Sequence, residues 1–491
     1  MSEHAALPSL SGKEIYGGNN TDCRCCGPDF KVSGIFSSHM VLQRDKPVHI
    51  FGFSSRPGSI VKGELDGAAA CAAVGEDKRW MLTFPPHPYS CVPVNMKLSD
   101  DRGNSAVFED ILFGDVWLIG GQSNAELHLD ACLEADPEPG FDENAPMRLF
   151  TQTRKYAAEH RELLGAPQAD IISPEWCWKR PDEKASLNFS AMGWYFGREL
   201  LRGTDVPQGL IMCCAGGACL RELVPAELAR AMGYFAGVNV PAAGYYNALI
   251  NPLIGLNFRG QLFFQGESEG IRRECAERYA RELALLVYDE RCRFGFDFPF
   301  YNVQISNYPK DGVRFFGYAD IIRTQQFDAA KLIKDYTLTV DMDLGSRDED
   351  SDWAHSPHKA ELGRRLAAQV LAREYGIGSQ ESASSPMPEE AVLSEDGTKA
   401  IVRFKNVNGA LKTISGQAVC GFSFGGRDDR KPAVAEIMSD CEVSVAVPRG
   451  ADTSLLGYAF FVSVNDGNAN LRGGTGLPAP AFLIPVKKQP D

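Results

Sequence analysis

A serine follows a strand-like apolar run in the segment Gly120-Gly-Gln-Ser-Asn124. The run before it, 115–119, is typical of a buried strand, and Ala125-Glu-Leu127 after it can begin a helix. Free N–H groups of a first helical turn can stabilise the oxyanion that forms when a hydroxyl attacks an ester. Alternatively, Ser123 or Asn124 merely caps the helix, since both are preferred caps. Ala125 replaces the second glycine of the Gly-x-Ser-x-Gly elbow, which disfavours an α/β-hydrolase interpretation.

A nucleophilic serine needs a general base, and the chain contains eight histidines. His355 stands out because Asp352 precedes it by three residues, so the carboxylate can reach the Nδ1–H of the ring within a single turn. That contact leaves Nε2 free to accept the serine proton. His358 is the rival base, but we expect it in the first turn of a helix, where the helix dipole disfavours its protonated form.

The surroundings of His355 also allow two interpretations without catalysis. Asp352 and His355 can belong to a solvated acidic loop that includes Asp348, Glu349 and Asp350. Asp341 and Asp343 can instead form a hard-cation loop with His355, although the segment lacks the spacing of an EF-hand.

Two further segments follow predicted strands and can supply oxyanion donors. Ala215-Gly-Gly-Ala218 comes after one strand, and its small residues allow a backbone amide, that of Gly217, to approach a substrate oxygen closely. Gln265-Gly-Glu-Ser-Glu269 comes after another, where the Gln265 side chain can donate to the oxyanion. The alternatives are a tight turn for the first segment and a helix cap for the second.

The elements that must position these residues alternate between strands and helices. Strand-like runs occupy 115–119, 209–213, 261–264, 300–304 and 336–340, and amphipathic helices are expected around 192–200, 273–288 and 358–375. Alternation of this kind indicates a mostly parallel sheet covered on both faces, with functional groups beyond the carboxyl ends of its strands. We place this α/β catalytic domain at residues 111–378.

Regions with short strands and frequent turns flank the α/β domain. Residues 1–28 predict an irregular tail, and residues 29–110 predict a β-sandwich-like domain because short apolar runs alternate with Gly and Pro turns. A linker rich in Ser, Glu and Pro begins at Gly378, and alternating strands return in residues 379–491, which predict a second β domain.

Composition limits the partners and the compartment. The net charge of -14 argues against a nucleic-acid or anionic-membrane surface, and no apolar run is long enough to span a bilayer. The first residues show no signal peptide, so we expect a cytoplasmic protein whose 14 cysteines stay reduced. Cys23-Arg-Cys-Cys26 holds one CxxC pair without the other ligands of a zinc site, so no metal is expected.

Taken together, these segments resemble the blocks of the sialate O-acetylesterase family, a branch of the SGNH hydrolases. The similar stretches are Gly114-Asp-Val-Trp-Leu-Ile-Gly-Gly-Gln-Ser-Asn124, Gly216-Gly217, Phe264-Gln-Gly-Glu-Ser268 and Lys359-Ala-Glu-Leu-Gly-Arg-Arg-Leu366 with Asp352 and His355 ahead of it. The segments 35–47 and 470–478 are similar to the family's leading and closing β regions.

The resemblance implies an SGNH-type, flavodoxin-like three-layer fold with flanking β modules. It also implies hydrolysis of acetyl esters on sialic acid by Ser123, His355 and Asp352, with no cofactor. The amides of Ser123 and Gly217 and the side chain of Gln265 would then form the oxyanion hole. Residues expected against the substrate are Gln122, Asn124, Gly216 and Glu267. Arg148, Arg180 or Arg221 can pair with a sialate carboxylate.

The chain departs from the family pattern around these blocks. Ser356 stands where the family has Pro, Ala125 where it often has Met, and Glu269 where it usually has Asn. Two residues, Trp353 and Ala354, separate Asp352 from His355 instead of the usual one. The alternatives therefore remain an esterase for acetylated xylan or another polysaccharide, and a carbohydrate-binding protein without catalysis. The sequence leaves the oligomeric state open.

Overall fold

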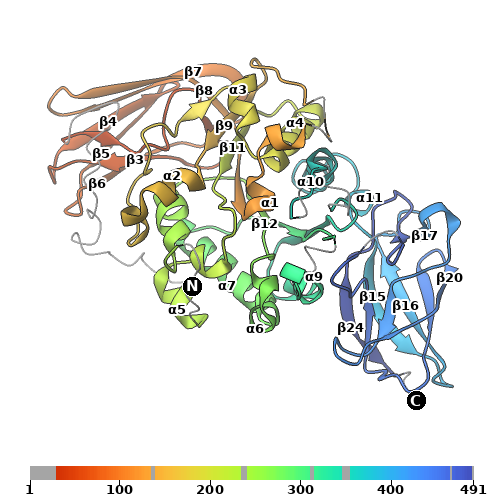
Figure 1. Ribbon diagram of the computed structural model, residues 1–491. Coiled ribbons are helices and arrows are strands. Elements are labelled where there is room, and N and C mark those ends of the chain that lie inside the picture. The colour runs from red at the N-terminus through yellow and green to blue at the C-terminus, as the bar shows by residue number, and fades with distance from the viewer. Residues whose placement is uncertain are drawn as a thin grey trace, which may run out of the picture. The chain divides into compact units, whose positions relative to one another are not determined.

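The computed structural model describes residues 29–133, 136, 139–233, 240–309, 314–345, 354–464 and 467–488 (Figure 1). The chain divides into two compact units. Unit 1 comprises residues 1–130, 138–262 and 285–300, and unit 2 comprises residues 131–137, 263–284 and 301–491. The division therefore separates the sequence segments expected to carry the nucleophile and the base.

The first part of unit 1 is built mainly from antiparallel strands. A three-stranded sheet has the order β1-β3-β6 (Lys31–Val32, Val48–Phe53 and Arg79–Phe84). The second group pairs β4 (Ile60–Leu65) with β5 (Ala68–Ala73) and β7 (Ser90–Asp100). Burial alternates strictly along β4, so one of its faces packs inward and the other meets solvent.

One long strand, β8 (Ser105–Gly121), belongs to both parts of unit 1. Its first half pairs with β7 in antiparallel fashion, and its second half pairs in parallel with β2 (Val41–Gln43) and β11 (Gln208–Met212). The expected domain border after residue 110 therefore falls inside a continuous strand. Asp115 to Gly121 are buried, as the apolar run predicts.

The α/β part of unit 1 is a largely parallel sheet. Its strands follow the order β10-β9-β11-β8-β12, with β9 at Met147–Thr151, β10 at Trp178–Lys179 and β12 at Gly260–Phe264. Helix α4 (Ala191–Gly203) begins at Ser190, whose Oγ accepts the N–H of Gly193 at 3.1 Å. A Cβ atom at Gly193 would lie 2.2 Å from Cδ1 of Ile119, so a glycine is needed for the helix to approach β8.

The core of unit 2 joins an α/β segment to the C-terminal sheet. Strands β13 (Phe300–Gln304) and β14 (Tyr336–Val340) alternate with helices α9 (Ala319–Asp328) and α10 (Lys359–Glu374). The helix expected at 273–288 is divided into α6 (Arg273–Ala276) and α7 (Tyr279–Phe294). The N–H of Arg278 bonds to the carbonyl of Cys275 at 3.2 Å, a tighter turn that interrupts the α-helix.

The C-terminal β region, drawn in blue in Figure 1, is an eight-stranded sheet with the order β19-β18-β22-β24-β15-β16-β21-β20. These strands span Lys431–Pro432, Phe422–Phe424, Leu455–Tyr458, Phe482–Lys487, Met387–Leu393, Lys399–Lys405, Glu442–Ala446 and Ala435–Ser439. Its core includes Phe482, whose ring lies 6.0 Å from that of Phe327 on α9. A second core therefore stabilises this region.

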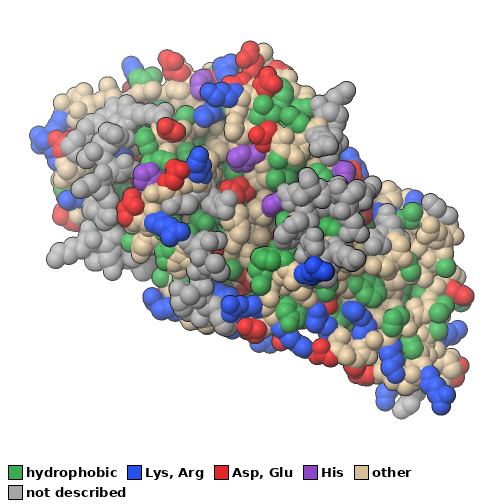
Figure 2. Space-filling model, in the orientation of Figure 1, with side chains coloured by type: hydrophobic (Ala, Val, Ile, Leu, Met, Phe, Trp, Pro, Cys, Tyr) green, Lys and Arg blue, Asp and Glu red, His purple; other side chains and the backbone are tan. Residues whose placement is uncertain are grey.

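The surface carries charges of both signs. On the face shown in Figure 2, Lys and Arg side chains are interspersed with Asp and Glu. Within the described residues, no helix is long and apolar enough to cross a membrane. The cysteines in this part of the chain are all free thiols, and the Cys23–Cys26 segment lies outside the described residues.

Candidate active site

Ser123 is the first residue of a short helix, α1 (Ser123–Glu126), directly after β8. The preceding Gln122 is the N-cap, in extended conformation and with no side-chain capping bond, so Ser123 does not occupy the capping position. The N–H groups of Ala125 and Glu126 both bond to the carbonyl of Gln122 at 2.9 Å. Gln122 and Asn124 are buried, whereas Ser123 is half-buried. Ser123 is thus the most solvent-accessible of these three residues.

The start of α4 fixes the segment that follows Ser123. The N–H of Ala191 bonds to the carbonyl of Leu127 at 2.8 Å, and the Oγ of Ser190 donates to the carbonyl of Ala125 at 2.6 Å. Leu127 itself donates to the carbonyl of Ser123 at 2.7 Å. Main-chain contacts on both sides therefore hold Ser123 in place.

The loop after β11 brings Gly217 to the same end of the sheet as Ser123. The N–H of Ala215 bonds to the carbonyl of Gly121 at 3.0 Å, which ties the two strand ends together. Gly217 is exposed, has a φ of 75°, and would have open space around an added Cβ atom. This geometry suits a residue whose backbone meets a ligand.

Two carboxylates hold this loop from opposite sides. Oε2 of Glu126 accepts the N–H of Gly216 at 2.5 Å, and Oε2 of Glu222 accepts the N–H of Cys219 at 2.9 Å. Burial raises the pKa of Glu222 to about 7. Gly216 is buried and its N–H donates to Glu126, so this residue helps to fix the loop. A contact between Gly216 and the substrate stays a prediction. Sequence reasoning missed Glu126 and Glu222 because nothing local distinguishes them from surface acids.

Gln265 lies in unit 2, fully buried at the end of β12. Its side-chain amide donates to the carboxylate of Glu269, and its carbonyl accepts the hydroxyl of Tyr279 at 2.7 Å. The amide of Gln326 donates to the same carbonyl at 2.9 Å. The contact with Glu269 therefore orients the side-chain amide of Gln265.

Glu267 is also buried and lies among large side chains of unit 2. Burial and the negative charge of Glu267 raise the pKa of the Tyr308 hydroxyl well above its usual value. Burial lowers the pKa of Arg323, and the charge of Glu267 opposes that shift. Glu267 is therefore surrounded by buried side chains, whereas Gly217 is exposed.

His355 is half-buried and lies shortly before α10 in unit 2. Asp352 falls outside the described residues, as do the acids 348–350, so the contact between Asp352 and His355 stays a prediction. His358 is the N-cap of α10, with no side-chain capping bond. The expectation that His358 lies inside the first helical turn was wrong by one residue, because the helix starts at Lys359.

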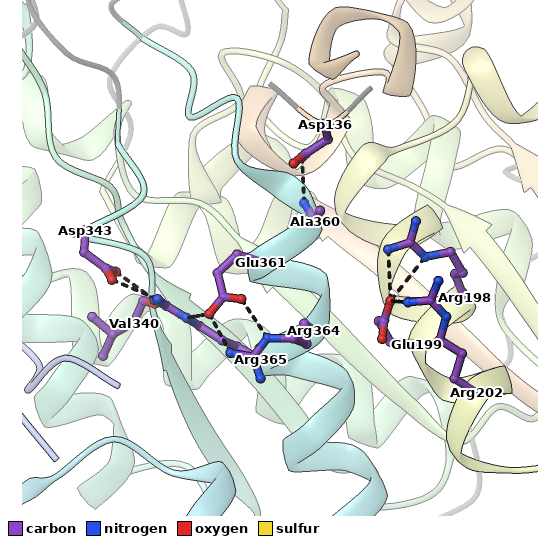
Figure 3. Close-up of polar contacts among 10 residues, drawn as sticks. All are labelled: Asp136, Arg198, Glu199, Arg202, Val340, Asp343, Ala360, Glu361, Arg364 and Arg365. Carbon is purple, nitrogen blue, oxygen red and sulfur yellow. Dashed lines mark hydrogen bonds and ion pairs between the residues drawn. The ribbon is translucent and has the colours of Figure 1, made fainter. Parts of the chain in front are cut away.

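Side chains from distant parts of unit 2 fix α10. Arg365 makes a two-pronged contact with Asp343, at 2.7 and 2.8 Å, and Arg472 reaches the same carboxylate at 2.9 Å. Figure 3 shows the contact between Arg365 and Asp343 and, at the start of the helix, the carboxylate of Asp136 accepting the N–H of Ala360. Burial favours the neutral form of Asp343, but its contacts with both arginines outweigh burial and lower its pKa.

A second buried carboxylate, Asp341, lies at the end of β14. It accepts the hydroxyl of Ser306, and burial raises its pKa to about 6 although the positive charge of Lys359 opposes the shift. Lys359 is fully buried, with its Nζ 4.9 Å from the centre of the Phe264 ring. The two acids considered for a cation loop thus have protein partners: Asp343 pairs with two arginines, and Asp341 accepts the hydroxyl of Ser306. Among the described residues, no cluster of three or more His, Cys, Asp or Glu side chains is arranged to hold a metal.

The three arginines considered for a substrate carboxylate are all engaged within unit 1. Arg148 and Arg180 both pair with Asp110, at 3.1 and 2.9 Å, and His39 contacts the same carboxylate at 2.6 Å. Arg221 is buried and donates to the carbonyl of Gly233 at 3.0 Å. None of them is therefore a ready partner for a ligand.

The chain is similar in sequence and in structure to known carbohydrate acetylesterases. Residues 113–372 match the family model described as carbohydrate esterase, sialic acid-specific acetylesterase. Sialate O-acetylesterase of Pongo abelii is 25% identical over 410 residues, covering 75% of this chain and 76% of the relative, and that of Homo sapiens is 24% identical with the same coverage. The structure of a carbohydrate acetylesterase from Xanthomonas citri superposes with a TM-score of 0.79 at 26% identity, covering 92% of this chain and 99% of that one.

Proposed function

Because this chain belongs to the family of sialic acid-specific carbohydrate esterases, and is therefore an esterase, we propose that it removes acetyl groups from sialic acid with Ser123 as nucleophile. The observation that carries the proposal is the position of Ser123 at the start of α1, directly beyond a buried strand and beside the loop of Gly217. An SGNH-type arrangement, in three layers, is part of the proposal.

The proposed reaction proceeds through an acyl-enzyme in two steps. Oγ of Ser123 attacks the acetyl carbonyl while Nε2 of His355 takes the hydroxyl proton, and Asp352 holds the ring through Nδ1–H. The tetrahedral intermediate collapses, the ester bond breaks, and His355 returns its proton to the departing sugar oxygen. Water then attacks the acetyl-serine with His355 as base, which releases acetate and restores Ser123.

Three donors are proposed for the oxyanion: the N–H groups of Ser123 and Gly217 and the side-chain amide of Gln265. The open space at Gly217 supports the second, and the contact with Glu269 that orients Gln265 supports the third. Removing one donor of this kind typically costs about 3 kcal/mol of transition-state stabilisation.

The test is acetate release from acetylated sialic acids, acetylated xylo-oligosaccharides and a small aryl acetate. We expect wild type to hydrolyse the sialic acid esters, and Ser123→Ala and His355→Ala each to lose more than about a thousandfold in kcat. His358→Ala is the matched control, because it removes the rival base close to the same helix. An active Ser123→Ala variant, or equal losses from the two histidine variants, would contradict the mechanism.

The second candidate substrate is an acetylated neutral polysaccharide. It is supported by the similarity to the Xanthomonas citri protein, whose description names carbohydrate acetyl esters without sialic acid. A preference for xylo-oligosaccharides would change the proposed substrate and leave the proposed roles of Ser123 and His355 unchanged. Inactivity on every ester would favour a carbohydrate-binding protein.

A further inference from the structure

A pocket of about 430 Å³ lies within unit 1, at the end of β9. Thr151 ends the strand and lines the pocket, together with the hydroxyl-bearing side chains of Thr153 and Tyr156. The opposite wall comes from the segment around β10 and α3 (Glu183–Leu187), and includes Lys179 and Lys184. A volume of this size falls within the range of small-ligand sites.

The pocket lies at the same edge of the sheet as the nucleophile. His128, which lines it, lies just beyond α1 and forms a backbone bridge with Ser190, the residue that also bonds to Ala125. Just after β9, the N–H of Gln152 bonds to the carbonyl of Met212 at 3.2 Å, at the end of the strand that leads to Gly217. The pocket therefore lies at the edge of the sheet where the strands that lead to Ser123 and Gly217 end.

Side chains of both charges line the pocket. Lys179 and Lys184 are exposed, and across the described ranges neither ammonium group forms an ion pair. Asp182 also lines the pocket, but its carboxylate accepts the N–H of Ala185 at 2.7 Å and caps α3. Glu175 is the other acid of the lining. Arg148, Arg180 and Arg221 are engaged by other groups, whereas the two lysines of this pocket form no ion pair with any described residue and can bind a carboxylate.

The walls also offer the groups that bind a sugar ring. Tyr156 is half-buried, and its ring packs edge-on against Trp176 at 5.6 Å, which fixes its orientation. The hydroxyls of Thr151, Thr153 and Tyr156 can donate and accept hydrogen bonds, as sugar hydroxyls do. A rigid aromatic ring beside such groups is typical of sites for small polar ligands.

We propose that this pocket holds an acidic sugar ring and that Lys179 and Lys184 bind its carboxylate. The proposal rests on the proposed function and adds the residues that would distinguish an acidic sugar from a neutral one. Each lysine would act as a specificity-determining residue through a charge-assisted contact, and neither takes part in acyl transfer.

The first experiment compares an acetylated sialic acid with its carboxyl methyl ester and with an aryl acetate. For the Lys179→Met and Lys184→Met double variant, we expect kcat/KM for the acid to fall about tenfold to a hundredfold, mainly through KM. The methyl ester and the aryl acetate should be hydrolysed as by wild type. Lys62→Met, at an exposed position of β4, is the control for the loss of a surface charge. Glu175→Gln should lower KM for the acid, since it removes a negative charge from the lining.

The second experiment separates this proposal from the esterase mechanism. Binding of unacetylated sialic acid is measured by calorimetry with the Ser123→Ala variant, which needs no catalysis, and with the same variant carrying both lysine substitutions. We expect the substitutions to weaken binding at least tenfold. Equal binding by the two proteins, or an equal loss of activity on the aryl acetate, overturns the assignment of the pocket. A wild type inactive on all esters that still binds sialic acid overturns only the proposed function.

Discussion

The segment that carries Ser123 and helix α10, which follows His355, are held by different forces. Around Ser123, main-chain hydrogen bonds and a close glycine contact at Gly193 fix the structure. Around α10, ion pairs between distant side chains do so, above all that of Arg365 with Asp343. Packing tolerates little change of volume, whereas a buried ion pair tolerates little change of charge. The two halves of the proposed triad should therefore fail under different substitutions.

The pKa values of two buried acids, Asp343 and Glu290, are shifted in opposite directions. In unit 2, contacts with Arg365 and Arg472 keep Asp343 ionised. In unit 1, burial raises the pKa of Glu290 on α7 to about 8, the charge of Asp289 adds to the shift, and the positive charge of Arg291 only partly opposes it. Glu290 is therefore mostly neutral at pH 7, and the contributions of Asp343 and Glu290 to stability should respond to pH in opposite directions.

The largest effect is expected from Asp343→Asn. The substitution leaves the guanidinium of Arg365, which is 6% exposed, without its two-pronged carboxylate partner. Breaking a buried pair in this way costs about 3–5 kcal/mol. Denaturant unfolding should show this loss, and esterase activity should fall with it, because α10 directly follows the proposed base, His355. Arg403→Met, which removes a largely exposed ion pair with Glu442, is the control and should change stability by less than about 1 kcal/mol. Equal losses in the two variants would contradict the contrast.

The next effect is the pH response of Glu290→Gln. The folded protein binds the Glu290 proton more tightly than the unfolded chain, so wild type should lose stability as pH rises from about 4.5 through about 8. The amide does not ionise, so the variant avoids that loss of stability, which is on the order of 5 kcal/mol above pH 8. Thermal melts at pH 5 and pH 9 should show a variant that gains on wild type only at the higher pH. A constant difference would mean that Glu290 is not neutral in the folded protein.

The smallest effect is expected from Glu126→Met. The change removes the carboxylate that accepts the N–H of Gly216 and so loosens the loop of Gly217. We expect kcat on an aryl acetate to fall about tenfold, equivalent to about 1.4 kcal/mol, with little change in KM. Glu126→Gln keeps an acceptor oxygen and should retain most of the activity. Equal activity in both variants, or a loss seen only in KM, would show that Glu126 does not position the loop.

The sequence predicted best what short-range structure determines. Ser123 at the start of a helix, and the neighbouring loop of Gly217, follow from an apolar strand, small residues and a helix start within a few positions. The α/β class and the flanking β regions followed from the periodicity of apolar residues. The helix expected at 358–375 is present as Lys359–Glu374 for the same reason.

Contacts between residues far apart in the sequence could not be predicted. Asp110 contacts His39, Arg148 and Arg180, so two arginines that looked available for a ligand are in fact partners of one carboxylate. Arg472 reaches Asp343 from the C-terminal region, and no local pattern indicates that pairing. Charge by itself does not show whether a side chain meets a partner or solvent, and only the fold decides it.

Strand β8 runs without a break from the N-terminal β region to the turn before Ser123. A protein shortened to begin at residue 111 would lose the first half of that strand and, with it, the partners of β7. Heat should therefore melt the N-terminal strands and the strand that leads to Ser123 in one cooperative transition. A protease should therefore not release the N-terminal β region from the α/β part as a separate folded fragment.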